Sequence, residues 1–169
     1  MSAFLSVKIS RDVNVALYKF TDYFKGFEKV RAVRELFGEE AEKVLGELKV
    51  EFMSRRGYMG VSDQDGHLIV SVYYLKHGEE KDIYLDLIHE LVHIKQFMQG
   101  EKLFDTSFDY VDRPTEIEAY KHTVKEARRI GMTEEEIYEY LRTEWMSEED
   151  VARLAKAVGV RYDPSADSS

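Results

Sequence analysis

The chain has 169 residues, 44% of them hydrophobic, which is enough to bury one sizeable core, and we expect a single domain over residues 1–169. It has 33 acidic and 24 basic residues, and the resulting net charge of -9 argues against nucleic acid or an anionic membrane surface as a partner. There is no cysteine, which excludes disulfides and cysteine-held zinc, so any metal must be bound by His, Asp or Glu.

The first 46 residues are expected to form N-terminal helices. One helical pattern runs over residues 13–24, and a second runs over residues 30–37 and stops at Gly38, a residue that commonly ends helices. This N-terminal segment lacks a charged start followed by an apolar run, and no stretch approaches about 18 apolar residues. We therefore expect a cytoplasmic protein. Its 34% charged residues are typical of proteins from hot environments.

After residue 46 the hydrophobic residues no longer recur at helical spacing and instead alternate with polar residues, as is typical of strands. Strands are predicted at 48–53, 56–61 and 67–75, and the last two form a hairpin around the turn sequence "SDQDG". His67 and His77 flank the last strand and are expected to be surface or turn residues. A helical pattern resumes at Asp82 and ends at Gly100.

The rest of the chain is predicted to be helical. Asp112, Pro114 and Thr115 are start signals for a helix over 115–130, and Thr115 with Glu118 fits a capping box. Two short helices begin at Thr133 and Ser147, giving C-terminal helices over 132–162 and a loose tail at 163–169. Trp145 continues the helical spacing of Tyr138, Tyr140 and Leu141 and is expected to lie in the core.

The sequence "HELVH" lies in the middle of the helix that starts at Asp82. Residues four apart on a helix point the same way, so His89 and His93 can bind one zinc ion, while Glu90 can reach a water on that ion. Zinc lowers the pKa of its water to about 7, and the carboxylate can take the proton as a general base. The surrounding residues are apolar, so unpaired histidines here would be costly, and this favours a zinc site.

A hydrolytic zinc site needs a third protein ligand and one open position. The metzincin pattern is excluded because Gln96 and Gln99 stand where that pattern requires Gly and His. The candidate ligands are the downstream residues Asp105, Asp109, Asp112, Glu116, Glu118 and His122. Glu116 shares its helical face with Ala119 and Tyr120 and is predicted to point inward, whereas Glu118 shares a charged face.

"HELVH" followed 23 residues later by Glu116-Ile117-Glu118-Ala119 resembles the gluzincin zinc metallopeptidases, most of all their minimal members, the minigluzincins. The resemblance covers residues 48–130. It implies that His89, His93 and Glu116 are zinc ligands and Glu90 is the base. It also implies that the strand at 67–75, or its neighbour, binds an extended peptide at its edge.

Two further residues are candidates for supporting the ligand histidines. Gluzincins often carry Asp four residues after the glutamate ligand, whereas this chain has Tyr120, whose hydroxyl could take that role or lie in the core. Asp86 lies one turn before His89 and is a second candidate, although a solvated helix acid is the simpler interpretation.

The sequence thus predicts an α+β fold, with a small sheet of three or more strands packed on the "HELVH" helix and the glutamate helix, and a zincin core over 47–131. The predicted function is a Zn²⁺-dependent peptidase acting on peptides or proteins, with no nucleic acid or membrane partner. Two alternatives stay open: a zinc-stabilised binding module with little turnover, and a latent peptidase blocked by its own C-terminal region.

Overall fold

A computed structural model gives the fold, and residues 6–167 are described. The chain divides into two compact units, Met1–Leu103 and Phe104–Ser169, which we call the N-terminal and C-terminal units. Helices combine with two small sheets, so the fold class is α+β, as predicted. Whether the two units behave as the single expected domain stays a prediction. Among the described residues, no helix is long and apolar enough to cross a membrane.

The main sheet of the N-terminal unit has four strands in the order β2-β4-β6-β5. These strands are β2 (Ala16–Lys19), β4 (Lys49–Met53), β6 (Leu68–Ser71) and β5 (Met59–Val61). β4 and β6 are parallel, and the other two pairs are antiparallel, which confirms the predicted hairpin of β5 and β6. A separate two-stranded sheet pairs β1 (Lys8–Ile9) with β3 (Phe24–Lys25).

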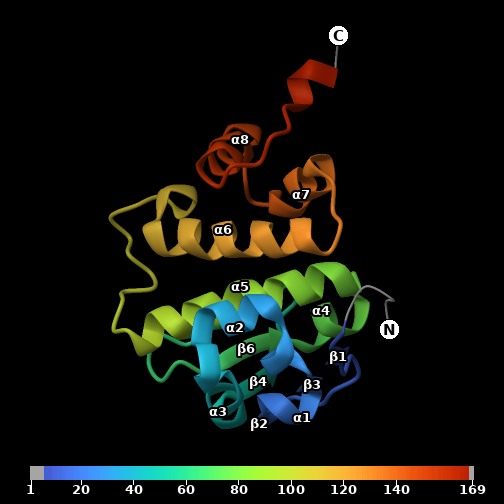
Figure 1. The fold of residues 1–169 in the computed structure, drawn as a ribbon, viewed down its shortest axis with the longest axis vertical. Coiled ribbons are helices and arrows are strands. Elements are labelled where there is room, and N and C mark those ends of the chain that lie inside the picture. The colour runs from blue at the N-terminus through green and yellow to red at the C-terminus, as the bar shows by residue number, and fades with distance from the viewer. Residues whose placement is uncertain (1–5, 168–169) are drawn as a thin grey trace. The chain divides into compact units, whose positions relative to one another are not determined.

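One face of the main sheet belongs to the core of this unit. Val50, Phe52, Leu68 and Val70 are fully buried, while the residues between them are less so, as expected of a sheet with one covered face. The long helix α5 (Glu80–Met98) packs on β5 and on α2 (Arg31–Phe37), and Figure 1 shows α5 and α2 side by side. Two further helices of the unit are α3 (Ala41–Glu47) and the four-residue α1 (Phe20–Tyr23).

The helix predicted over residues 13–24 is wrong. The segment forms β2, then α1, then β3, because β2 pairs with β4 and an aromatic cluster takes the residues that follow. Phe20 and Phe24 lie with ring centroids 4.9 Å apart, and both contact Phe27 in the 3-10 turn η1 (Phe27–Lys29). Tertiary packing here overrides a helical period. The second predicted helix is confirmed as α2, which ends at Gly38 in the 3-10 turn η2 (Gly38–Glu40). Residues 1–5 of the expected N-terminal helices lie outside the described residues.

The strand predicted over 67–75 is also too long. It ends at Ser71, and the β-branched and aromatic residues after it form helix α4 (Val72–His77). The Ser71 hydroxyl accepts a hydrogen bond of 3.1 Å from the backbone N–H of Tyr74, a standard helix N-cap. Capping by Ser71 therefore outweighs the strand propensity of the residues that follow it.

The turn between β5 and β6 fits closely against the C-terminal end of α5. Gly66 has a φ of +77°, in the left-handed region that favours glycine. A Cβ atom added at Gly66 would lie 2.5 Å from Cδ1 of Phe97 on α5. This residue must therefore be glycine for two separate reasons, its backbone angle and its neighbour.

The C-terminal unit is helical. It contains α6 (Pro114–Arg129), α7 (Glu134–Leu141), α8 (Glu148–Ala157) and the 3-10 turns η3 (Tyr110–Asp112) and η4 (Pro164–Asp167). The capping boxes predicted at Thr133 and Ser147 are both confirmed. The capping box predicted for Thr115 is wrong: α6 begins one residue earlier at Pro114, and no side chain caps it.

Two smaller predictions for this unit also need correction. The tail predicted to be loose forms η4 over 164–167, and its last two residues lie outside the described part of the chain. Trp145, predicted to lie in the core, is 60% exposed. The helical spacing breaks because α7 ends at Leu141, so that Trp145 falls in the connection to α8.

Candidate metal centre

The candidate metal centre lies partly on helix α5, which is buried around most of its circumference. His89, Glu90 and His93 lie in its middle and are 5%, 8% and 4% exposed. The two imidazole rings have centroids 4.9 Å apart and planes inclined by 80°. This geometry follows from the spacing of four residues and presents both rings on one side of the helix. Two buried histidines at this distance are suited to binding one ion.

Gln96 lies one turn after His93 and was missed by the sequence interpretation. Its side-chain oxygen is 2.7 Å from Nδ1 of His93, and Gln96 is fully buried. Because an amide oxygen only accepts, Nδ1 of His93 carries the proton and Nε2 keeps the lone pair that a metal needs. The spacing of three residues on a helix was the available signal, since it brings the two side chains together.

Asp86 and Tyr74 join α4 to α5. The Tyr74 hydroxyl donates a hydrogen bond to the Asp86 carboxylate. Burial, and then the negative charge of Asp86, raise the pKa of Tyr74 far above its usual value, so the hydroxyl stays protonated and can donate. Asp86 therefore has a structural partner on α4, and its support of His89 stays a prediction.

The residue before β5 lies within electrostatic range of Glu90. Burial raises the pKa of Tyr58, and the negative charge of Glu90 raises it further. The packing of the unit agrees, because β5, the strand directly after Tyr58, packs on α5, the helix that carries Glu90.

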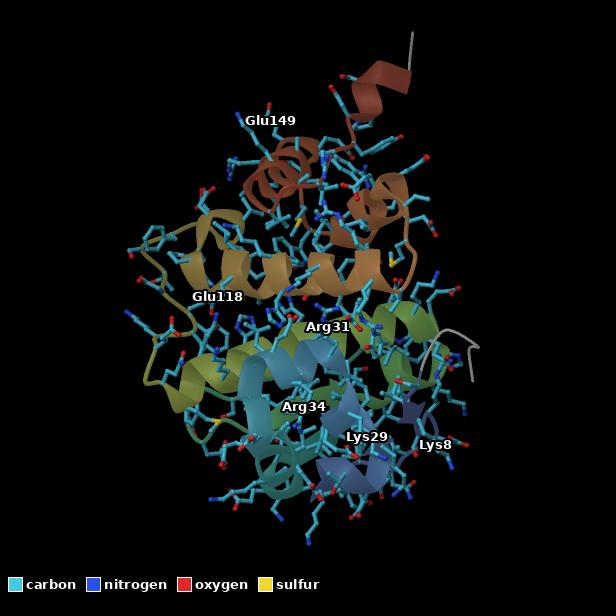
Figure 2. All side chains as sticks on the ribbon, in the orientation of Figure 1. Lys8, Lys29, Arg31, Arg34, Glu118 and Glu149 are labelled. Atoms are coloured by element: carbon cyan, nitrogen blue, oxygen red, sulfur yellow. The ribbon has the colours of Figure 1, made fainter. Side chains whose placement is uncertain are left out.

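Glu116 lies in the first turn of α6 and is 4% exposed. Ala119, Tyr120 and Thr123 on the same face are buried too, whereas Glu118 is exposed, as the facing argument predicts. Figure 2 labels Glu118 on this helix. The sequence pattern therefore orients α6 correctly.

Within the described part of the chain, His89, His93 and Glu116 form a group that could hold a metal ion. One ligand atom from each side chain lies within 4.8 Å of the other two, and all three residues are buried. Two imidazoles and one carboxylate are the ligand set of a familiar class of catalytic zinc sites. The donor atoms of this group thus fit zinc by their chemistry.

The other proposed third ligands are not in this group. Asp112 forms an ion pair with Arg153 at 2.8 Å, and Asp105 accepts hydrogen bonds from the backbone and hydroxyl of Ser107. Glu118 and His122 line an open pocket of about 540 Å³ along α6. Asp109 is exposed before η3.

Tyr120 is 7% exposed, and its hydroxyl lies 2.9 Å from the hydroxyl of Tyr110. Either oxygen can be the donor, so this pair gives Tyr120 a hydrogen-bond partner within the C-terminal unit. Its predicted support of a ligand histidine is untested by this contact.

Comparison of the chain with protein-family models, with curated proteins and with solved structures found no match. The interpretation of the site therefore depends on its residues and geometry.

Proposed function

We propose that this chain is a zinc-dependent metallopeptidase of the gluzincin type. The observation that carries the proposal is the buried group of His89, His93 and Glu116, with Glu90 directly after the first histidine. A structural zinc site is usually closed by four protein ligands and has no need of a base. Three ligands and an adjacent carboxylate favour catalysis.

Zinc at this group would act as a Lewis acid and lower the pKa of a water molecule to about 7. His89 and His93 would hold it through neutral nitrogens, and the hydrogen bond between His93 and Gln96 prepares one of them. Glu116 would add a negative charge that partly offsets the charge of the ion. Each ligand thus has a defined chemical part.

Glu90 would act as general base and then as general acid. It would take a proton from the attacking water and hand it to the leaving amine as the peptide bond breaks. Its low exposure of 8% keeps bulk water away from this proton transfer.

The substrate would bind along the free edge of β5. β6 lies between β4 and β5, so both of its edges are paired and it cannot accept another strand. β5 is one of the two outer strands, and it packs on α5, the helix that carries Glu90. An extended peptide that pairs with β5 would therefore run beside the proposed base.

Two measurements test this function. Purified protein should contain about one zinc per chain, and His89→Ala or His93→Ala should remove most of it. Glu90→Gln should keep the zinc and lower peptide hydrolysis by about a hundredfold or more, the scale of lost acid and base help. Glu101→Gln, at an exposed site just after α5, is the matched control and should change neither quantity.

The outcomes separate this proposal from its rivals. Equal hydrolysis by wild type and Glu90→Gln would exclude Glu90 as the base. Full zinc content with no hydrolysis in either protein would favour a zinc-stabilised binding module or a latent enzyme. Normal zinc content in both histidine variants would exclude the site itself.

A further inference from the structure

Trp145 is the single tryptophan of the chain, and it is 60% exposed in the connection between α7 and α8. Its ring stands edge to face against Tyr110, with centroids 4.6 Å apart and planes inclined by 85°. A large aromatic side chain that is held in place yet mostly exposed is a frequent feature of binding surfaces.

A chain of contacts connects this pair to the helix of Glu116. The Tyr110 hydroxyl contacts the Tyr120 hydroxyl at 2.9 Å, and Tyr120 lies one turn after Glu116 on the same face of α6. The rise of α6 from Glu116 to Tyr120 and the centroid separations of 6.3 Å and 4.6 Å along the three rings add up to a path. The Trp145 ring therefore lies at most about 20 Å from the Cα atom of Glu116. An extended peptide covers this length with about six residues.

The surroundings of Trp145 are strongly acidic. Residues 104–169 hold 16 of the 33 acidic and 9 of the 24 basic residues, so this unit carries -7 of the net charge of -9. Glu144 precedes Trp145 and is exposed, and Glu149 is exposed in the first turn of α8, whereas the neighbouring Glu148 forms an ion pair with Arg142. Figure 2 shows Glu149 pointing away from the α8 ribbon. Such a field attracts cations and repels acidic peptides.

The aromatic pair already lies near one guanidinium. The Arg113 guanidinium carbon lies 5.8 Å from the centroid of the Tyr110 ring, within the range of cation–π attraction. The indole of Trp145 is a stronger cation–π acceptor than a phenol. The exposed indole is therefore suited to an arginine or lysine side chain supplied by another molecule.

We propose that Trp145, supported by Tyr110, is a subsite for a basic side chain of the substrate peptide, arginine above lysine. This proposal rests on the peptidase function and gives it a substrate class: peptides with an arginine a few residues from the cleaved bond. The flat guanidinium stacks on the indole, and the neighbouring carboxylates favour its charge.

Fluorescence of the single tryptophan tests this binding directly. Zinc-loaded, full-length Glu90→Gln is titrated with peptides that are identical except for arginine, citrulline or phenylalanine at one position, moved in turn through six residues. Citrulline keeps the shape of arginine without its charge. The arginine peptide should shift the emission of Trp145 and bind at least about fivefold more tightly than the citrulline peptide. Its binding should weaken in about 0.5 M salt, because salt screens attraction between exposed charges. Equal affinity for the three peptides, or no shift with arginine, would overturn the subsite.

Kinetics with the wild-type enzyme separate the two proposals. Trp145→Ala should raise KM for the arginine peptide at least fivefold and remove the preference over citrulline, while Trp145→Phe should keep part of it. Tyr73→Ala, at a 43% exposed aromatic residue of the N-terminal unit, is the matched control. Hydrolysis without any arginine preference would overturn the subsite and leave the peptidase standing. Arginine-dependent binding without hydrolysis would overturn the peptidase and leave a basic-peptide subsite.

Discussion

Nδ1 of His93 lies 2.7 Å from the side-chain oxygen of Gln96, and both side chains are buried on α5. This contact fixes the tautomer and the ring orientation of one proposed zinc ligand before any metal arrives. The sequence "HELVHIKQ" thus carries a supporting residue as well as the proposed ligand pair and the proposed base.

The first prediction concerns this supporting residue. Gln96→Leu should weaken zinc binding by about tenfold or more, because a metal-bound histidine then loses its hydrogen-bond acceptor. Gln96→Glu should restore binding, since a carboxylate also accepts from Nδ1. Competition with a chelator gives the zinc affinity. Gln99→Leu, at an exposed glutamine one turn later, should bind zinc like wild type; the prediction is wrong if the two leucine variants have the same affinity.

The second prediction separates the two glutamates of α6. Glu116→Ala should weaken zinc binding tenfold or more and abolish hydrolysis, whereas Glu118→Ala should leave the metal in place. Because Glu118 is exposed and no capping box forms, its loss should change the free energy of unfolding by about 0.5 kcal/mol or less. Zinc titration and denaturant unfolding measure both. Zinc loss in the Glu118 variant alone would contradict the ligand assignment.

The candidate ligands could be named from the sequence because helix geometry shows which side chains share a face, and the gluzincin resemblance then pointed to Glu116. His89 and His93 share a side of α5 by spacing, and Glu116 shares the buried face of α6 with Ala119 and Tyr120. The hydrogen bond between Tyr74 and Asp86 joins two different helices, and such long-range pairs leave no trace in local spacing.

The fold predictions failed where tertiary contacts decide between two local patterns. Leu17 belongs to a helical repeat in the sequence, yet it lies in β2 because the main sheet pairs that strand with β4. The residues after Ser71 read as a strand, yet the Ser71 cap turns them into α4. Trp145 continues the helical spacing of α7, although α7 ends at Leu141. The hydrophobic period of the sequence alone could not locate that helix end.

The third prediction concerns pH and His67, which lies between two carboxylates. Its Nδ1 is 2.5 Å from Asp65 and its Nε2 is 2.8 Å from Glu51 on β4. Burial lowers the pKa of His67, but the hydrogen bonds to Asp65 and Glu51 outweigh this effect and raise it above the usual value. The hydrogen bonds to His67 lower the pKa of Asp65. Both nitrogens can donate only when the ring is protonated.

This cluster should therefore stabilise the fold most in mildly acidic solution. His67 contributes fully to the free energy of unfolding below its usual pKa of about 6.5. This contribution is lost as the pH rises through the raised pKa of the folded state. The contribution of Asp65 is lost as the pH falls through its lowered value. Relative to His67→Leu, wild type should lose about 1 kcal/mol or less of unfolding free energy between pH 6 and 8, since water screens the exposed carboxylates. Denaturant unfolding across this range measures it, and a constant difference would show that His67 does not titrate there.

The fourth prediction concerns Glu134 at the start of α7. Arg128 donates to it through two nitrogens at 3.0 and 2.7 Å, and the backbone N–H of Arg161 donates at 3.0 Å. The hydrogen bonds from Arg128, and then the one from the backbone of Arg161, together lower the pKa of Glu134 to about 2. These bonds join α6, α7 and the segment after α8.

Glu134→Gln should destabilise the protein by about 1 kcal/mol at pH 7, discounted because water reaches the pair. A lowered pKa means that the stabilisation is present above the usual value and disappears as the pH falls through about 2. Thermal unfolding at pH 7 and pH 3 checks the trend. Glu149→Gln, which removes an exposed acid from the first turn of α8, should cost less. An equal loss in both variants would point to the helix dipole instead of the ion pair.

Gly66 and Phe97 also limit how this chain can vary over evolutionary time. A side chain at position 66 would be strained by the left-handed backbone angle and would also clash with the ring of Phe97. A single substitution of Gly66 is therefore disfavoured for two reasons. Related chains should therefore keep both residues or change them as a pair, with a small side chain at 97 accompanying Asn at 66. Such covariation would identify descendants of this fold even where the rest of the hairpin has diverged.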